Sequence, residues 1–186
     1  MSIFVAAFIV GACAPAPPPA TDIHPANPIT FTGIGGVYPG QLATNAATFG
    51  FPVPRYGDLD YNTMCRSSAH TIYPDVSVIM DGPSKSELRI AAMYVRDPAF
   101  ATSSGMRVGV TETQLRNNYG SALKVFRMNW EGGYQIAGHP VGAYYHDVAV
   151  ILHEDRGITF YLDSDHKVTE IKVSKVDWLG DDEGCV

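Results

Sequence analysis

The 186-residue sequence has few charged residues and lacks any cluster of basic ones. Asp, Glu, Lys and Arg together make up 17% of the chain, and the 13 basic residues are dispersed. Because a nucleic-acid-binding domain needs a concentrated basic patch, this distribution argues against nucleic acid as a partner. The net charge of −6 also argues against binding to anionic lipid head groups. An apolar fraction of 46% is ample for a hydrophobic core.

The first apolar run, Ile3 to Val10, is too short to span a bilayer, which needs about 20 apolar residues. It is typical of the central region of a secretory signal, although no Lys or Arg precedes it. The next residues, Val10-Gly11-Ala12-Cys13, are typical of a bacterial lipobox, in which the cysteine sulfur forms a thioether to a diacylglycerol. We therefore predict a signal peptide at 1–12 and a lipidated Cys13 that anchors the mature chain to a membrane.

A proline-rich segment, APAPPPA at 14–20, follows this cysteine directly. Such a segment cannot form a helix and favours an extended polyproline II spacer. We expect a tether at 13–29 that holds a folded body off the membrane, in the cell envelope outside the cytoplasm. An organism with two membranes would carry it on the outer one. The alternatives are a disordered, uncleaved N-terminus, or a free secreted protein in which Cys13 is incidental.

Only two other cysteines are present, Cys65 and Cys185. An exported chain meets an oxidising compartment, so the odd count is explained by one lipidated cysteine and one disulfide pair. A Cys65–Cys185 bridge would tie the middle of the fold to its C-terminal end. The alternative is a pair of buried free thiols.

Two segments of the chain resemble each other. TGIGGVYPGQLATNAATFG at 32–50 corresponds to TSSGMRVGVTETQLRNNYG at 102–120, and both end in a glycine after a short helical pattern. Downstream, VSVIMDGPSKSELRIAAMYV at 76–95 corresponds to ITFYLDSDHKVTEIKVSKV at 158–176, each predicting two strands around an acidic turn. Two units of the same order indicate an internal duplication.

The local patterns predict an α+β fold. Thr111 and Gln114 have the spacing of a capping box, so a helix is expected after Thr111 and up to Gly120. Each unit is expected to be a short helix followed by antiparallel strands, with the helices packed on one face of the sheet. We place the first unit at 30–98 and the second at 99–186.

The glycine, threonine and aromatic framework around Gly109 and Gly120 resembles the SmpA/OmlA-type envelope lipoproteins, and the tandem arrangement is similar to that of the β-lactamase inhibitor protein. The resemblance covers most of residues 32–186. The first unit departs from it, because Pro39 precedes Gly40 and Gln41 stands where the second unit has Thr111. The resemblance implies a fold and a lipoprotein class, but no inhibited enzyme and no partner.

Several groups of residues contain the residue types of nucleotide-binding, metal-binding or catalytic sites, but they lack the spacing or the structural context that such sites need. Tyr38 stands where a dinucleotide-binding loop in TGIGG would need its third glycine, so we interpret the glycines as turn residues. Three histidines seven residues apart fall on alternating sides of expected strands, and two acidic clusters suit hairpin turns. A serine pair beside a histidine lacks a nucleophile elbow. The three histidines are His139, His146 and His153. The acidic clusters are His153–Gly157 and Asp163–His166, and the serine pair with its histidine is Ser67, Ser68 and His70.

We therefore expect neither a catalytic residue nor a metal ion or cofactor, and look to the aromatic residues for a binding surface. Trp130, Tyr134, Tyr144 and Tyr145 are the candidates for the sheet face away from the helices, because tyrosine and tryptophan dominate protein-binding hot spots. The favoured function is a non-catalytic scaffold or assembly factor that binds another envelope protein. The alternative is a tethered or secreted inhibitor of an envelope hydrolase such as a β-lactamase, protease or muramidase. A hydrolase with an unrecognised site is a third hypothesis.

Intact-mass and N-terminal peptide spectrometry of the native protein tests the anchor. We expect a mature chain that begins at Cys13 and carries the added mass of a diacylglycerol thioether, because only the thiol at this position can form it. A native chain that begins at Met1 with an unmodified thiol would contradict the anchor.

Overall fold

The computed structural model describes residues 22–53, 66–84, 86–127, 134–136, 139–141 and 147–179. For 134–136 and 139–141 the description is limited to the backbone. The statements below refer to these residues.

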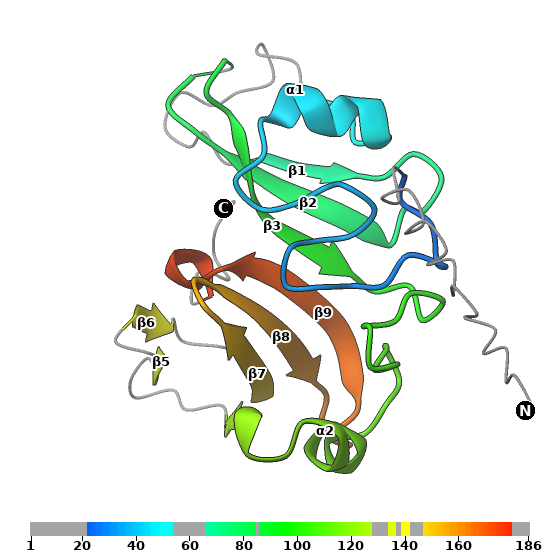
Figure 1. Cartoon of the computed structure of the whole chain (residues 1–186), viewed down its shortest axis with the longest axis vertical. Coiled ribbons are helices and arrows are strands. Elements are labelled where there is room, and N and C mark those ends of the chain that lie inside the picture. Colours follow the sequence, from blue (N-terminus) through cyan, green and yellow to red (C-terminus); the bar gives the residue numbers. More distant parts are fainter. Residues whose placement is uncertain are drawn as a thin grey trace, which may run out of the picture.

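Seven strands form one antiparallel sheet in the order β1-β2-β3-β9-β8-β7-β4 (Figure 1). Their bounds are β1 Arg66–Ala69, β2 Val76–Asp81, β3 Arg89–Val95, β4 Lys124–Phe126, β7 Asp147–His153, β8 Arg156–Leu162 and β9 Val168–Lys175. Two short strands, β5 (Tyr134–Ile136) and β6 (His139–Val141), pair only with each other. The sequence prediction of an antiparallel sheet is confirmed.

The two acidic clusters are hairpin turns, as predicted. Glu154 and Asp155 join β7 to β8, and Glu154 takes a positive φ of 56°. In the turn between β8 and β9, the Asp163 carboxylate accepts hydrogen bonds of 2.9 Å from the backbone N–H groups of Asp165 and Lys167. Acidic residues suit such turns because their short side chains can hydrogen-bond to the nearby backbone.

Both predicted helices are present and short. α1 (Ala43–Ala46) continues as the 3-10 turn η1 (Ala47–Phe49) and ends at Gly50, whose φ is +88°. α2 (Glu112–Tyr119) begins with the predicted capping box and is followed by η3 (Gly120–Ala122). A last 3-10 turn, η4 (Val176–Trp178), follows β9.

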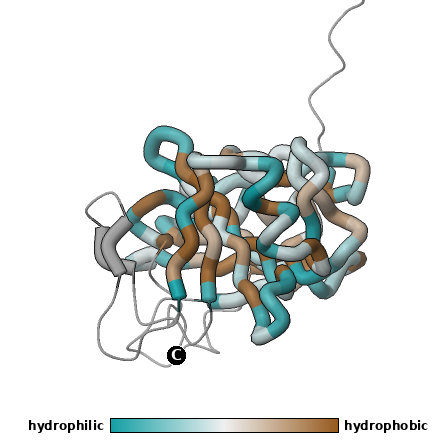
Figure 2. Tube along the Cα trace, turned by 90° about the horizontal axis from the view of Figure 1, so that it is seen from below, coloured by the Kyte–Doolittle hydropathy of each residue, from teal (hydrophilic) through white to brown (hydrophobic). Residues whose placement is uncertain are grey.

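The main hydrophobic core lies between the sheet and the layer that carries the helices. Ala43 and Ala46 of α1 and Leu115 of α2 belong to the same buried cluster as the strand residues that face them. Long loops complete the layer: in Figure 1 the segment that contains residues 22–42 crosses in front of β2 and β3. Figure 2 shows the apolar residues concentrated along the strands and inside the body. We call the outer surface formed by residues 23–53 the loop face.

The segment expected to be a tether, 13–29, overlaps the folded body at its C-terminal end. Ile23 and Ile29 are 4% and 0% exposed, so residues 22–29 belong to the folded body. Ile29 forms a parallel bridge with Thr102, in which its N–H donates to the Ala101 carbonyl oxygen at 2.8 Å. Burial of these two apolar side chains stabilises the packing of this part of the segment against the core.

The α+β class is confirmed, whereas the structure does not show two separate tandem units. β3 pairs with β9 through four residue pairs, from Ala92↔Ser174 to Val95↔Ile171. The boundary expected between residues 98 and 99 therefore separates strands that share one sheet.

Substitution of Gly50 by alanine tests how closely the end of η1 packs against His70, the residue that follows β1. A Cβ atom at Gly50 would lie 2.5 Å from His70 Nε2, whereas at Gly105, with a similar φ of +85°, it would meet nothing within 4 Å. Both G50A and G105A should lose ~1–2 kcal/mol from backbone strain. G50A should lose at least about 1 kcal/mol more from overpacking. Urea unfolding measures both, and equal losses would contradict the close fit.

Candidate functional site

Two consecutive tight turns form the wall of a cleft on the loop face. In the first turn, Thr30 and Gly33 exchange backbone hydrogen bonds of 2.9 and 3.1 Å. In the second, Ile34 and Val37 exchange bonds of 3.0 and 2.9 Å. Each turn has two central residues, which is the tightest connection of a β-hairpin.

The glycines of this segment are turn residues, as the sequence predicts. Gly35 and Gly36, at the centre of the second turn, have φ values of +53° and +84°. A two-residue turn of this kind requires positive φ at both central positions, which glycine adopts without strain. A Cβ atom at Gly35 would also lie 1.7 Å from the Asp22 carbonyl oxygen, so the second turn is packed tightly against the start of the described chain.

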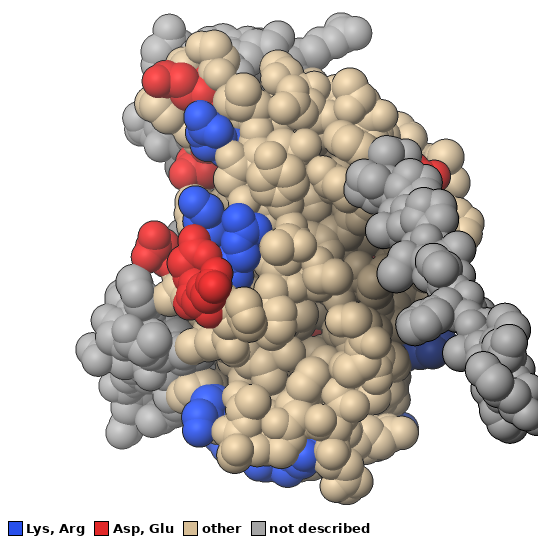
Figure 3. Space-filling model, in the orientation of Figure 1, with Lys and Arg blue, Asp and Glu red and all other residues tan. Residues whose placement is uncertain are grey.

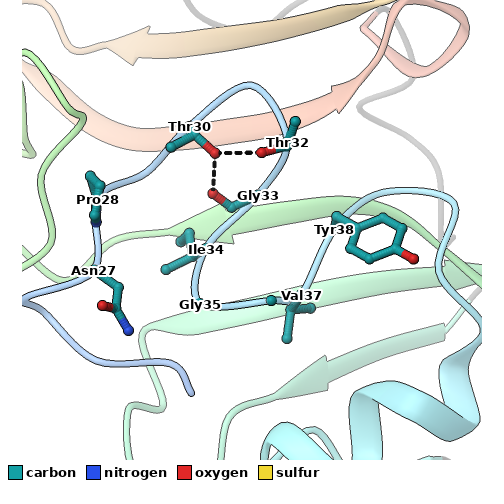
Figure 4. A pocket seen from close by; sticks show the side chains of 10 residues that line it. Asn27, Pro28, Thr30, Thr32, Gly33, Ile34, Gly35, Val37 and Tyr38 are labelled. Carbon is teal, nitrogen blue, oxygen red and sulfur yellow. Dashed lines mark hydrogen bonds between the residues drawn. The ribbon is translucent and has the colours of Figure 1, made fainter. Parts of the chain in front are cut away.

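The cleft has a volume of about 290 Å³, is open to solvent and contains no charged side chain. Figure 4 shows Asn27 and Pro28 on one side, Tyr38 on the other and the two turns between them. The Thr30 hydroxyl donates to the Gly33 carbonyl oxygen and shares a hydrogen bond with Thr32, both 2.9 Å. Tyr38 is 43% exposed. The site therefore offers an aromatic ring and neutral hydrogen-bonding groups.

The loop face around the cleft is uncharged as well. The sequence from residue 23 to residue 54 contains no Asp, Glu, Lys or Arg. Figure 3 shows a broad surface of uncharged residues, with most of the charged side chains gathered along its margins. A partner that covers this surface would not have to desolvate an ion.

A separate group of ionisable side chains joins α2 to the sheet. Glu112 accepts from Arg116 at 2.8 Å and from Arg127 at 2.7 Å, and Arg127 also donates to Asp147 at 2.6 Å. Burial favours the neutral form of Glu112, but the hydrogen bonds from the two arginines outweigh it and lower the pKa of this carboxyl. The His166 ring lies 3.2 Å from Arg127. We interpret the group as a structural clamp, because both carboxylates are held by arginine.

The serine and histidine residues near β1 are also engaged in structural contacts. Ser68 donates its hydroxyl to the Pro52 carbonyl oxygen at 2.7 Å. His70 is 5% exposed, and its Nδ1 accepts from the N–H groups of Ile72 and Tyr73 at 3.2 and 3.0 Å. The ring stacks on Tyr73 at a centroid distance of 5.3 Å. Nδ1 therefore carries no proton and serves the turn that follows β1.

The sheet face away from the helices is not open at its centre. Lys172, Thr159 and Ser174 are each 0% exposed there, and the Lys172 ammonium lies 5.6 Å from the centre of the Tyr94 ring. Val148 and Tyr161 on the same face are buried too. These positions of the face are therefore buried, whereas the side chains of Trp130, Tyr134, Tyr144 and Tyr145, the residues expected to bind a partner there, are not among those that the structure describes.

The residues singled out from the sequence are not brought together in the part of the chain that the structure describes. Cys13, Cys65, Cys185, Trp130, Tyr144, Tyr145 and His146 lie outside the described residues. Tyr134 and His139 are described by backbone only, in β5 and β6. His153 is exposed at the end of β7 and lies 5.3 Å from the Phe31 ring. Within the described ranges, no group of His, Cys, Asp and Glu is arranged to hold a metal ion.

Comparison with known proteins assigns the chain to no family. No protein-family model matches the chain, and no curated protein matches it. The crystal structure of a DUF4309 family protein (YjgB) from Bacillus subtilis is similar over 76% of this chain and 84% of that one, with 10% identity and a TM-score of 0.45. Among the described residues, no helix is both long and apolar enough to span a membrane.

The buried His70 makes stability depend on pH. Burial lowers the pKa of the imidazole and outweighs a hydrogen bond to the Phe49 backbone that raises it. The imidazole is therefore protonated more readily in the unfolded chain than in the folded one. As a result, the free energy of unfolding decreases as the pH is lowered from about 7 towards 5. We expect a shallower fall in His70→Gln, measured by urea unfolding at several pH values. The other histidines are present in both proteins and contribute equally to both profiles. If the free energy of unfolding fell equally with pH in the unmodified protein and in His70→Gln, a role for His70 would be contradicted.

Proposed function

We propose that this protein is a non-catalytic envelope lipoprotein whose folded body binds another protein through the loop face. The observation that supports this most is the uncharged surface of residues 23–53, with a cleft beside the exposed ring of Tyr38. Aromatic side chains at the centre of an uncharged patch are typical of protein-binding hot spots.

The proposed position in the cell rests on the N-terminal sequence. A signal peptide at 1–12 directs export, Cys13 carries the lipid, and the proline-rich residues 14–20 hold the body off the membrane. Because residues 22–29 are folded, the tether is at most residues 13–21 long in this proposal. This length still allows roughly 25 Å of extended chain at ~3.1 Å per residue.

The proposed surface differs from the one expected from the sequence. The aromatic residues Trp130, Tyr134, Tyr144 and Tyr145 pointed to the sheet face away from the helices. Burial at the centre of that face leaves little room for a partner among the described residues. The loop face offers accessible groups instead, so we assign the partner to it.

We also propose that the two halves arose by duplication. The hairpins predicted to correspond are β2–β3 and β8–β9, and they occupy mirrored positions in the strand order, with β3 and β9 as neighbours. Each half also has a short helix that ends at a glycine of positive φ, Gly50 or Gly120. These matched positions support the two-unit interpretation within one sheet.

A pair of lysine substitutions tests the binding surface. Tyr38→Lys puts a cation at the cleft, and Ser164→Lys adds the same charge at an exposed turn between β8 and β9. In quantitative pull-downs from detergent-solubilised envelope, we expect Tyr38→Lys to retain at least tenfold less of the captured protein than the unmodified chain. Ser164→Lys should retain it fully. Equal retention by both variants would refute the loop face as the binding surface, and an unmodified chain that captures nothing above background would refute protein binding itself.

A further inference from the structure

One edge of β3 changes its neighbour partway along the strand. The pairing of β3 with β9 ends at Ala92↔Ser174. Nearer the start of β3, the Gly40 N–H donates to the Ile90 carbonyl oxygen at 2.6 Å, and the Ile90 N–H donates to the Gln41 carbonyl oxygen at 2.9 Å. The loop segment at Gly40 therefore takes the place of β9 there. Figure 1 shows β3 and β9 diverging on the side of η4.

A second cleft, of about 180 Å³, lies at this change of neighbour. Ala91 lines it and is 7% exposed. The register of β2 and β3 passes from Ile79↔Ala92 to Met80↔Ile90, so Ala91 is the extra residue of a β-bulge. Bulges are frequent next to active sites, where they redirect a side chain or end the pairing of strands. The cleft therefore has a backbone feature typical of a functional position.

Two basic side chains converge on Gly40 in this cleft. Arg89 Nη1 donates to the Gly40 carbonyl oxygen at 3.0 Å, which leaves the other N–H groups of the guanidinium for a ligand. A Cβ atom at Gly40 would lie 3.3 Å from Lys175 Cε and 3.5 Å from Lys175 Nζ, so the absence of a side chain makes room for the lysine. Neither cation forms an ion pair with a residue that the structure describes.

The charge of the lining matches a monoanion. Arg89 and Lys175 contribute two positive charges. Asp81, which stands opposite Arg89 in the register of β2 and β3, contributes one negative charge. The lining therefore has a net charge of 2 − 1 = +1. A carboxylate would neutralise this charge, whereas the dianion of phosphate would leave an excess of negative charge beside Asp81.

The rest of the lining is apolar. Trp178 of η4 is half-buried, and Ile90 is 1% exposed. An aromatic ring beside aliphatic groups suits an apolar side chain, and the few polar groups of such a pocket set the orientation of the ligand. The cleft is smaller than the roughly 300–1,000 Å³ typical of sites for drug-sized molecules. Its size therefore suits a ligand no larger than a single amino acid.

We propose that this cleft binds the α-carboxylate of an apolar amino acid, either free or at the C-terminal end of a peptide. Arg89 offers N–H groups in the planar arrangement that fits a carboxylate, and Lys175 adds a second positive charge. Trp178 and Ile90 contact the apolar side chain. The site is separate from the cleft beside Tyr38, so the inference goes beyond the proposed function and does not rest on it.

Titrations of the ¹⁵N-labelled whole chain, with Cys13→Ser to prevent lipidation, test the ligand class by NMR. We expect N-acetyl-leucine to shift the amide signals of Gly40 and Ala91 with a Kd of about 1 mM or tighter, as for a ligand of this size. N-acetyl-leucinamide lacks the carboxylate and should bind at least tenfold more weakly. The absence of saturable shifts at these amides, equal binding of the amide, or phosphate binding as tight as that of N-acetyl-leucine would overturn the proposal.

Free leucine distinguishes the two sources of the carboxylate. Tighter binding of leucine than of N-acetyl-leucine would assign the site to a free amino acid, because the ammonium group can then contact Asp81. Weaker binding would assign it to the end of a peptide, in which that nitrogen is an uncharged amide. Both results support a carboxylate site.

Charge variants test the assigned residues. Lys175→Gln should weaken N-acetyl-leucine binding about three- to fivefold, whereas Lys124→Gln, on the distant edge strand β4, should match the parent chain. Asp81→Asn raises the net charge of the lining and should tighten phosphate binding about threefold, a gain that a folding defect would not produce. Unchanged affinities in both Lys175→Gln and Asp81→Asn would overturn the assignment. Tyr38→Lys leaves the lining of this cleft intact, so this proposal and the loop-face proposal fail separately.

Discussion

The pairing of β3 with β9 is the constraint on which the rest of the structure depends. It joins strands that lie about eighty residues apart in the sequence, and it makes one sheet of β1–β3 and β4, β7–β9. Such a contact is costly in chain entropy, and it is retained because each strand completes the core of the other half. Met93 and Val95 of β3 and Ile171 and Val173 of β9 all lie in the main core.

The loop layer depends on this shared sheet. Ile23, Ile29 and Ile34 are buried against a core that contains strand residues of both halves. The turns at Thr30–Gly33 and Ile34–Val37 satisfy their own backbone groups, so the segment can lie on the core without a helix or a strand of its own. On the face seen in Figure 3, most of the visible charged side chains lie along the margins, and the surface between them is uncharged.

Local signals explain what the sequence predicted well. The capping box at Thr111, the glycine stops at Gly50 and Gly120 and the acidic hairpin turns each act within a few residues, so they can be recognised without tertiary information. The position of β3 beside β9, the burial of Lys172 and the packing of residues 22–29 depend on distant contacts. For the cleft beside Tyr38, the sequence offers one indication, which is that residues 23–54 contain no charged side chain.

The bridge between Ile29 and Thr102 also connects the N-terminal end of the described chain to the start of the second half. A pull on the N-terminus reaches Ile23 and the Asp22–Gly35 contact first, and then the hydrogen bonds that Ile29 makes with Ala101 and Ser103. These contacts lie in the loop layer rather than in the strand ladders. Tension applied from this end would therefore load the contacts of the loop layer before it loaded the strand ladders.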